Sequence, residues 1–296
     1  MVEGRPVVHV SGLVPARVRS ALAEAFSLVD VPDGADGVLT LITTTVDEAY
    51  LDRVGPNLRI VANYGVGVDN IDLGAVAARN ILVANTPDVL TGTTAELAIA
   101  LTLSLLRRVT EGDRLLRRRE RWEFTLEFML GESLRGKTFG IVGPGRIGRA
   151  TGELAEAFGA HAAFAGRGDD LAALLQTSDV VSLHCALTPE TYHLIDGAAL
   201  ARMSESAVLV NTARGPIVDE RALVDALRAG SIAGAALDVF EREPELAQEL
   251  LGLENVVLTP HLGSATRQTR EAMGLLAVSA LRSVLIEGRE PPNLVR

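Results

Sequence analysis

The segment Phe139–Gly148, with the sequence FGIVGPGRIG, restricts the fold of this chain more than any other feature. Phe139–Val142 predicts a short buried strand, and Arg146–Phe158 has the apolar spacing of a helix. The glycines of a G-x-G-x-x-G pattern lie between them, at Gly143, Gly145 and Gly148. In this order they form a tight turn, allow a pyrophosphate to approach the backbone, and let the helix pack on the strand. The segment predicts a dinucleotide site, and the alternative is a glycine-rich turn in an ordinary α/β domain.

Short strands rich in β-branched residues alternate with helical segments along the chain, which predicts parallel βα units. The expected strands outside the glycine segment are Val7–Val10, Val38–Ile42, Leu58–Ala62, Ala162–Ala165, Val180–His184, Ala207–Val210, Gly234–Leu237 and Val256–Leu258. The other expected helices are Ala16–Phe26, Asp47–Val54, Leu73–Arg79, Thr93–Arg119 and Arg267–Glu287.

This pattern predicts two Rossmann-like, doubly wound, parallel-sheet α/β domains, with the cofactor domain inserted in a discontinuous substrate domain. We expect residues 1–90 to form the N-terminal part of the substrate domain and residues 91–266 the dinucleotide-binding domain. Residues 267–296 would return the chain to the substrate domain. Ligands of such folds bind at the carboxyl ends of strands and between domains, so we expect a cleft between the two.

Composition excludes several classes of protein. The chain of 296 residues is long enough for one large or two medium domains. Its net charge of −10 argues against nucleic-acid binding and favours a cytoplasmic protein. Cys185 is the only cysteine, which excludes an intramolecular disulfide and a cysteine-based zinc site, and no metal site is expected. The longest apolar stretch, Ala95–Leu106, is too short to span a membrane.

Polar residues follow successive strand candidates in the second half of the chain, at Arg214, Glu243 and His261. Each lies in a loop at the carboxyl end of a strand, where α/β folds place their active sites. The planar guanidinium of an arginine can bind a carboxylate through two hydrogen bonds, and a histidine can donate a proton to a developing alkoxide. A nearby carboxylate would hold the imidazole in one tautomer and keep it protonated. Beside a nicotinamide these groups could reduce a 2-oxo acid, although each alone is typical of an ordinary surface residue.

Further motifs are spread over nearly the whole chain. Beside the glycine pattern they are YGVGVDNID at Tyr64–Asp72, NTPDVLTGTTAE at Asn85–Glu96, HCALTPET at His184–Thr191, NTARGPIVDE at Asn211–Glu220, ALDVFEREP at Ala236–Pro244, TPHLGS at Thr259–Ser264 and PNLV at Pro292–Val295. Together they resemble the motifs of the D-isomer-specific 2-hydroxyacid dehydrogenase family.

The resemblance implies a role for each of the three polar residues. Arg214 would bind the substrate carboxylate and carbonyl, His261 would be the acid–base group, and Glu243 would be its partner. The backbone of Val66 and Gly67 would line the substrate pocket.

The resemblance also implies a set of cofactor contacts. The expected pyrophosphate contacts are Gly143, Gly145, Arg146, Ile147 and Gly148. Thr94 would approach the nicotinamide end of the cofactor, and Asp238 would bind the nicotinamide amide. The further expected contacts are His184, Ala186, Thr212, Ala213, His261 and Gly263.

One departure from the family pattern concerns the coenzyme. NAD-specific sites carry Asp or Glu at the end of the second strand, on the ribose hydroxyls. Here Gly166 occupies that position and Arg167 follows it. NADP(H) is therefore favoured, because an arginine can bind a 2′-phosphate. Alternatively, Asp169 or Asp170 folds back onto the ribose and Arg167 points to solvent, which would allow NAD(H).

A second departure is a short connection before His184. Only Asp169–Ser178 follow the second strand and its turn, so a helix–strand piece usual in the family is shortened. Ala186 also replaces a proline common in the family, which makes the loop near the adenosine less rigid. We expect weaker cofactor binding with intact chemistry.

The predicted function is reduction of a small 2-oxo acid, with glyoxylate or hydroxypyruvate as the expected substrate. The alternatives are a phosphoglycerate dehydrogenase-like enzyme and a dinucleotide-sensing, corepressor-type scaffold. The family is typically dimeric, and Thr93–Arg119 would contribute to the subunit contact. The arginine-rich stretch Arg107–Arg121 fits a solvated or subunit-facing surface, with an anion or acidic partner as the alternative. His193 is expected to lie exposed in a turn.

Overall fold

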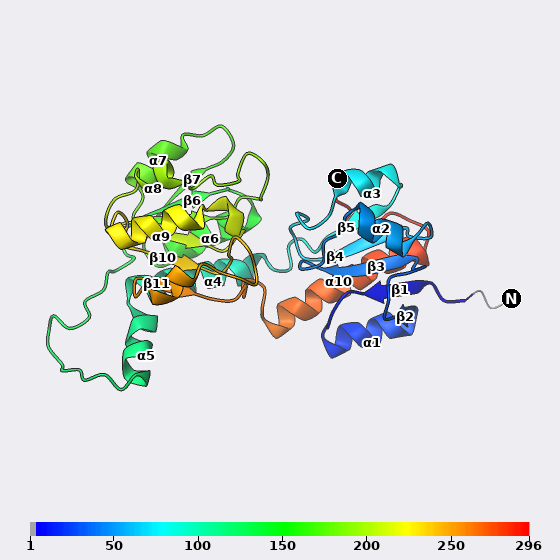
Figure 1. The fold of residues 1–296 in the computed structure, drawn as a ribbon, viewed down its shortest axis with the longest axis horizontal. Coiled ribbons are helices and arrows are strands. Elements are labelled where there is room, and N and C mark those ends of the chain that lie inside the picture. Colours follow the sequence, from blue (N-terminus) through cyan, green and yellow to red (C-terminus); the bar gives the residue numbers. More distant parts are fainter. Residues whose placement is uncertain (1–3, 296) are drawn as a thin grey trace. The chain divides into compact units, whose positions relative to one another are not determined.

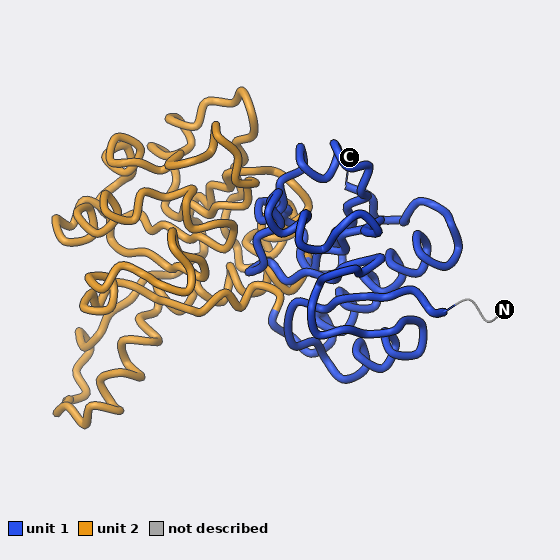
Figure 2. The backbone as a smooth tube through the Cα atoms, turned by 45° about the vertical axis from the view of Figure 1, so that its right-hand side comes forward, with its two compact units in different colours: residues 1–90, 265–296 blue, residues 91–264 orange. Residues whose placement is uncertain are grey.

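The structure is a computed structural model that describes residues 4–295, and it divides into two compact units (Figure 1, Figure 2). Unit 1 comprises residues 1–90 and 265–296, and unit 2 comprises residues 91–264. Each unit contains its own parallel sheet, so the expected fold class is confirmed. Unit 2 ends at Ser264, before the expected boundary, and Thr266 is already the N-cap of the last helix of unit 1.

Unit 1 is built on a five-stranded parallel sheet in the order β2-β1-β3-β4-β5. Its strands are β1 (Val7–Val10), β2 (Ser27–Val29), β3 (Gly37–Leu41), β4 (Ile60–Tyr64) and β5 (Leu82–Ala84). Its helices are α1 (Ala16–Ala25), α2 (Glu48–Val54), α3 (Leu73–Ala78) and α10 (Arg267–Leu285). Asp47 and Asp72 cap α2 and α3 by accepting backbone N–H groups of the first turn. Helix α10 packs against β4, whose residues are all buried.

Unit 2 contains a six-stranded parallel sheet in the order β11-β10-β9-β8-β6-β7. Its strands are β6 (Thr138–Val142), β7 (His161–Ala165), β8 (Val180–Leu183), β9 (Val208–Asn211), β10 (Gly234–Leu237) and β11 (Val256–Leu258). Its α-helices are α4 (Thr91–Leu106), α5 (Val109–Arg117), α6 (Arg146–Ala157), α7 (Leu171–Thr177), α8 (Gly197–Leu200) and α9 (Glu220–Ala229). Two 3₁₀ turns are η1 (Gly215–Ile217) and η2 (Gln248–Gly252).

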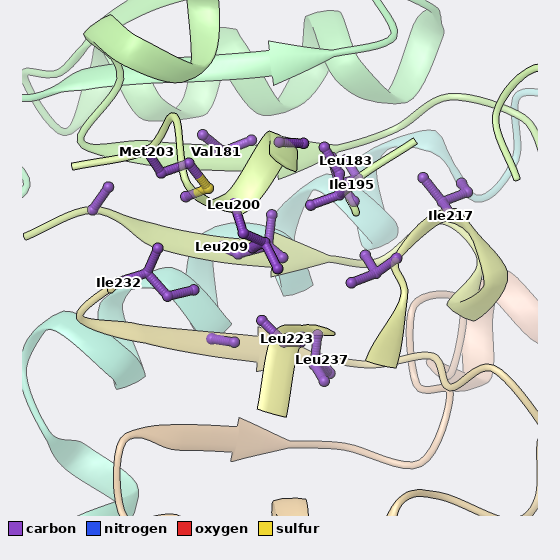
Figure 3. Close-up of a cluster of buried hydrophobic side chains, with 14 of the residues drawn as sticks. Val181, Leu183, Ile195, Leu200, Met203, Leu209, Ile217, Leu223, Ile232 and Leu237 are labelled. Atoms are coloured by element: carbon purple, nitrogen blue, oxygen red, sulfur yellow. The ribbon is translucent and has the colours of Figure 1, made fainter. Parts of the chain in front are cut away.

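The central strands of the unit 2 sheet are buried on both faces. On β9, Leu209 belongs to an apolar cluster that includes residues of α8 and α9, seen in Figure 3. The adjacent Val208 and Val210 belong to another cluster, with residues of α4 and α6. Successive strand residues point to opposite faces, so a sheet covered on both sides needs continuous apolar strands. The short apolar runs of the sequence satisfy this requirement.

The strands of unit 2 end level with one another. Val142 of β6 pairs with Leu183 of β8, which pairs with Asn211 of β9. Asn211 in turn pairs with Leu237 of β10, and Leu237 with Leu258 of β11. The residues that follow these strands therefore gather at one edge of the sheet. The strand order reverses between β6 and β8, and such switch points are where ligands bind in folds of this class.

The expected single helix over Thr93–Arg119 is wrong, because the chain forms α4 and α5 with a break between them. Arg108 has a left-handed backbone, with φ of 53°, which no helix interior accommodates. The returning chain supplies the reason, since the N–H of Glu132 donates to the carbonyl of Leu106 at 2.8 Å. That contact replaces the next helical hydrogen bond. None of the helices in the described part of the chain is both long and apolar enough to cross a membrane.

Candidate active site

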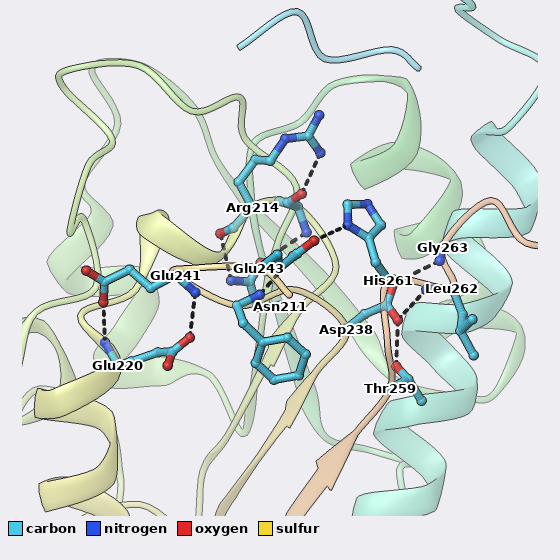
Figure 4. Close-up of polar contacts among 12 residues, drawn as sticks. Asn211, Arg214, Glu220, Asp238, Glu241, Glu243, Thr259, His261, Leu262 and Gly263 are labelled. Carbon is cyan, nitrogen blue, oxygen red and sulfur yellow. Dashed lines mark hydrogen bonds and ion pairs between the residues drawn. The ribbon is translucent and has the colours of Figure 1, made fainter. Parts of the chain in front are cut away.

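His261 and Glu243 form the central pair at the carboxyl edge of the unit 2 sheet (Figure 4). His261 Nδ1 lies 2.7 Å from Glu243 Oε2, and Glu243 Oε1 accepts the N–H of Phe240 at 3.0 Å. Burial would raise the pKa of Glu243, but the hydrogen bond and charge of His261, the Phe240 N–H and the charge of Arg214 together lower it. Glu243 is therefore ionised and fixes one nitrogen of the imidazole.

A buried carboxylate holds the loop that carries His261. Asp238 accepts the Thr259 hydroxyl at 2.6 Å, the Leu262 N–H at 2.7 Å and the Gly263 N–H at 2.8 Å. The His261 N–H also donates to the Asp238 carbonyl at 2.8 Å. His261 has φ of 53°, a conformation that a non-glycine residue keeps only when its surroundings enforce it. Asp238 supplies that enforcement, and burial raises the pKa of its carboxyl despite these hydrogen bonds.

Thr94 supports the same loop from helix α4. Its hydroxyl donates to the carbonyl of Gly263 at 3.1 Å, and its side chain is buried. The sequence suggested Thr94, Asp238 and Gly263 as cofactor contacts, and the structure brings the three together. Their binding to a cofactor stays a prediction.

Arg214 lies in the loop after β9. The Asn211 side chain shapes this loop by donating to the Arg214 carbonyl at 2.9 Å and accepting the Ala213 N–H at 3.0 Å. A Cβ atom on Gly215 would lie 1.9 Å from the carbonyl carbon of Phe240, so only glycine allows this approach. The loop of Arg214 and the loop of Glu243 are therefore packed directly together.

The glycine turn is tightly packed at two of its glycines and open at the third. Gly143 has φ of 97°, and a Cβ on Gly148 would lie 2.2 Å from the Gly143 carbonyl oxygen. By contrast, a Cβ on Gly145 would meet nothing within 4 Å. Gly145 is the N-cap of α6, which has no side-chain cap, whereas aspartates cap α7, α8 and α9. Arg146 and Ile147 open the helix, so its N-terminus fits a pyrophosphate.

The end of β7 lies at the edge of the sheet, with only α7 between it and β8. Gly166 follows the strand, and its N–H donates to Asp169 Oδ2 at 2.8 Å. Asp170 caps α7 by accepting the Ala173 N–H, so it is committed to the helix. Arg167 is exposed. Of the two acidic residues considered from the sequence, Asp169 is the one that folds back to the strand end.

Two buried polar atoms at this edge have no partner among residues 4–295. The Thr212 hydroxyl is buried without a hydrogen bond, and so is Nδ1 of His184, whose Nε2 lies 2.9 Å from the Ser182 hydroxyl. Burial lowers the pKa of His184 to about 4, so this histidine is neutral. Orphaned buried polar atoms are uncommon, and those beside the strand ends fit a polar ligand such as a dinucleotide. Ala186 lies in the next loop, where its carbonyl accepts the Thr191 hydroxyl.

In unit 1, the loop after β4 contains Val66 and Gly67. The carbonyls of residues 65–67 accept hydrogen bonds from the Thr86 N–H at 2.9 Å, the Asn85 amide at 2.8 Å and the Asn63 amide at 2.7 Å, respectively. In a trans peptide the N–H points away from the carbonyl. The backbone N–H groups of Val66 and Gly67 therefore point away from the Gly65 and Val66 carbonyls, and their binding to a substrate stays a prediction.

Several supporting residues were not identified from the sequence. Asn63 and Asn85 orient the unit 1 loop, and Glu220 and Glu241 exchange hydrogen bonds near the His261–Glu243 pair. Most of them lie within the quoted motifs, which was the available signal, but their partners are distant in sequence. His193 is not exposed as expected, since its side chain is 28% exposed and lies 3.2 Å from Glu241.

Comparison with known proteins decides the family. The model of the D-isomer specific 2-hydroxyacid dehydrogenase, NAD binding domain, matches residues 99–263, more than half of the chain. The chain belongs to the D-isomer-specific 2-hydroxyacid dehydrogenase family. A glyoxylate reductase of Thermococcus litoralis is 46% identical over 279 residues, covering 88% of this chain and 83% of the relative.

Solved structures agree with this family assignment. A Thermus thermophilus protein has a TM-score of 0.91 and 41% identity, covering 98% of this chain and 100% of its own. An NADPH-dependent glyoxylate/hydroxypyruvate reductase of Sinorhizobium meliloti, in complex with NADP and malonate, has a TM-score of 0.88 and 36% identity, covering 99% and 97%. As a family member, this dehydrogenase is an oxidoreductase with an NAD(P)-binding domain in unit 2.

Proposed function

We propose that this dehydrogenase reduces the carbonyl of a small 2-oxo acid, of the glyoxylate or hydroxypyruvate kind, to the D-2-hydroxy acid. The observation that carries the proposal is the hydrogen-bonded His261–Glu243 pair beside Arg214. When bound, the nicotinamide cofactor supplies a hydride for the carbonyl carbon. The chain must then supply a proton for the carbonyl oxygen of the substrate and a hydrogen-bonding partner for the substrate carboxylate.

His261 is the proposed proton donor. Glu243 accepts from Nδ1, which leaves Nε2 to carry the proton for the carbonyl oxygen. The negative charge of Glu243 favours the imidazolium form that this step requires. Without a fixed carboxylate, the ring could rotate or adopt the other tautomer.

The substrate carboxylate is the proposed ligand of Arg214, whose planar fork can form two parallel hydrogen bonds with it. The N–H groups of Val66 and Gly67 are the proposed contribution of unit 1 to substrate binding. Accordingly, we propose the substrate-domain role for residues 1–90 and 265–296 and the dinucleotide-binding role for residues 91–264.

The proposed coenzyme is NADPH, held at the pyrophosphate by Gly145, Arg146 and Ile147. Gly166 itself carries no carboxylate and the exposed Arg167 follows it, which favours NADPH, whereas the Asp169 carboxylate that accepts the Gly166 N–H is the feature that favours NADH. The similarity to an NADPH-dependent reductase supports this choice. Arg167→Ala should lower kcat/KM for NADPH about tenfold and leave that for NADH unchanged. A wild-type enzyme that uses NADH better than NADPH would contradict the preference.

The first experiment follows loss of nicotinamide absorbance with NADPH and NADH in parallel. The panel of acids contains glyoxylate, hydroxypyruvate and 3-phosphohydroxypyruvate. Rapid oxidation of NADPH with glyoxylate or hydroxypyruvate is expected. Preference for the phosphorylated acid would favour a phosphoglycerate dehydrogenase-like enzyme, and tight coenzyme binding without turnover would favour a corepressor-type sensor.

We further propose a homodimer formed through the arm, residues 109–130. Phe124 is 82% exposed and Leu126 is 88% exposed, and Trp122 stacks on Phe128 at 6.0 Å between ring centroids. Apolar exposure on this scale is typical of an interface. Light scattering should show a dimer that dissociates with Phe124→Asp and Leu126→Asp combined.

A control for this test is Leu13→Asp, which alters an equally exposed leucine in unit 1. It should leave the dimer intact. A monomeric wild-type protein would contradict the proposal. A cytoplasmic location stays a prediction from the acidic composition.

A further inference from the structure

Glu220 is a buried carboxylate that the proposed chemistry does not use. It is the first residue of α9, and only 8% of its surface is exposed. Helix α9 is already capped by Asp219, which accepts the Ala222 N–H at 3.0 Å. A charged side chain is rarely buried without partners that replace its hydration, so the partners of Glu220 indicate its role.

The Glu220 carboxylate binds the backbone at two points of one segment. Oε1 accepts the N–H of Glu241 at 2.5 Å, and Oε2 accepts the N–H of Ala247 at 3.2 Å. Figure 4 shows the contact between Glu220 and Glu241. These bonds lie at the two ends of segment 241–247, so one carboxylate holds the segment closed.

Glu241 returns the contact to helix α9. Its Oε2 accepts the N–H of Glu220 at 3.4 Å, and its Oε1 lies 3.2 Å from Nε2 of His193. The N–H of His193 donates to the carbonyl of Pro216, in the 3₁₀ turn η1. The start of the segment is therefore fixed to two neighbouring elements.

Segment 241–247 carries Glu243, which bonds to His261. Beside the segment lies a cavity of about 540 Å³, whose walls include Glu220, Arg242 and Leu246. Leu246 and Ala247 pack against the apolar cluster of unit 2, and the Glu245 N–H donates to the Arg242 carbonyl at 2.9 Å, so Glu220 adds polar anchors at both ends of a segment that borders a cavity.

We propose that Glu220 is a positioning residue for the acid–base pair, because its carboxylate fixes the segment that places Glu243 against His261. The inference rests on the proposed function, in which Glu243 holds His261 in its reactive form. The other charged groups around the pair are Arg214, whose charge lowers the pKa of Glu243, and Asp238, whose carboxylate accepts the Leu262 N–H. Loss of Glu220 should therefore resemble partial loss of Glu243.

The test compares Glu220→Ala and Glu220→Gln, each alone and combined with Glu243→Gln. Glu220→Ala is expected to lower kcat about 10- to 100-fold, to leave KM for the coenzyme unchanged, and to move the pH profile to lower pH. Glu220→Gln keeps one acceptor oxygen and should recover part of the loss. In the Glu243→Gln background, Glu220→Ala should lower kcat by no more than about twofold, because Glu220 is proposed to act through Glu243 and that carboxylate is already absent.

A second readout does not depend on turnover. In an NMR titration of the histidine rings, the signals of His261 should titrate at lower pH in Glu220→Ala than in the wild-type protein. The signals of His161, exposed on β7, should not move. Glu249→Ala, on the wall of the same cavity, is the matched control and should leave both kcat and the His261 titration unchanged.

Ala247→Pro tests the second hydrogen bond without changing Glu220. Ala247 has φ of −58°, which suits proline, and proline lacks the N–H that Glu220 accepts. This variant should shift the pH profile in the same direction as Glu220→Ala, but by a smaller amount. If Glu220→Ala does not fold, Ala247→Pro provides the test in its place. An unchanged His261 titration in these variants, or an equal fold-loss from Glu220→Ala with and without Glu243, would overturn the inference. If the wild-type enzyme reduces no 2-oxo acid, the proposed function fails, while the titration still decides the role of Glu220.

Discussion

The two units hold their functional atoms in opposite ways. In unit 1, the neutral amides of Asn63 and Asn85 bind backbone carbonyls, and the groups turned outward are backbone N–H groups. In unit 2, the carboxylates of Asp238 and Glu220 bind backbone N–H groups of the segments that carry His261 and Glu243, although the loop of Arg214 is again held by an asparagine amide, that of Asn211.

This difference has consequences for both sites. Asparagine amides do not titrate, so the loop of unit 1 keeps its geometry over the whole working range of pH. Carboxylates do titrate, and a buried one depends on its partners, so the site of unit 2 is tied to pH. Changes in the unit 1 loop should affect substrate binding without moving the pH profile, whereas changes at His261 or Glu243 in unit 2 should affect the chemical step and its pH dependence.

His261→Ala should give the largest effect. Loss of the proton donor is expected to lower kcat about 10²- to 10⁴-fold, with coenzyme affinity unchanged, in steady-state assays and coenzyme titrations. His161→Ala, which alters an exposed histidine of the same unit, is the control and should retain wild-type rates. If His261→Ala retained wild-type activity, His261 would not be the proton donor. The contrast between the two units would then lose its chemical basis.

Arg214→Ala is expected to lower kcat/KM for the 2-oxo acid by about two to four orders of magnitude, because the bidentate clamp is lost. Arg214→Lys should recover only a small part, since an ammonium group cannot form the planar pair. Kinetics over a range of acid concentrations measure this effect, with the exposed Arg202→Ala as control. Equal rates for Lys and Arg would mean that charge alone, rather than geometry, binds the carboxylate.

Glu243→Gln should change the pH profile in a defined direction. Burial would raise the pKa of Glu243, but the hydrogen bond and charge of His261 lower it, so the carboxylate stays negative below the usual range of a glutamate. Glutamine has no charge, so the imidazolium should lose its proton at lower pH. The basic limb of kcat/KM for reduction should therefore move to lower pH, with a greater loss of activity at alkaline than at acid pH.

The control for this profile is Glu245→Gln, an exposed glutamate of the same segment. Its pH profile should coincide with that of the wild-type enzyme. If Glu243→Gln lowered kcat/KM equally at every pH, without a shift of the profile, the role of Glu243 would be structural.

Asn85→Ala should give the smallest effect and the sharpest contrast. Loss of its amide frees the Val66 carbonyl and loosens the loop, so KM for the 2-oxo acid should rise about tenfold with kcat little changed. The pH profile should stay at its wild-type position, because no titratable group is altered. Asn57→Ala, at an exposed asparagine, is the control. If the pH profile of Asn85→Ala shifted, the unit 1 loop would also influence the titrating groups, and the two units would not have separate roles.

Local sequence patterns predicted most of the strands, and also the strand ends that are followed by the candidate site residues. Buried apolar runs of four or five residues gave the main strands, and the glycine spacing gave the turn before α6, because these patterns depend only on neighbouring residues. Strands β2 and β5, of three residues each, were missed, although the equally short β11 was predicted. Arg214, Glu243 and His261 could be singled out because parallel strands bring their ends to one edge.

Only the tertiary structure decided how these residues are held. The break after Leu106 depends on Glu132, and the closure of segment 241–247 depends on Glu220, partners that no local pattern connects. Hydrogen bonds between distant segments form only after the sheets have packed, so a sequence records the donor and acceptor but not the pairing. The sequence by itself determined which groups could perform the chemistry, and the packed fold decided which backbone and side-chain partners orient them.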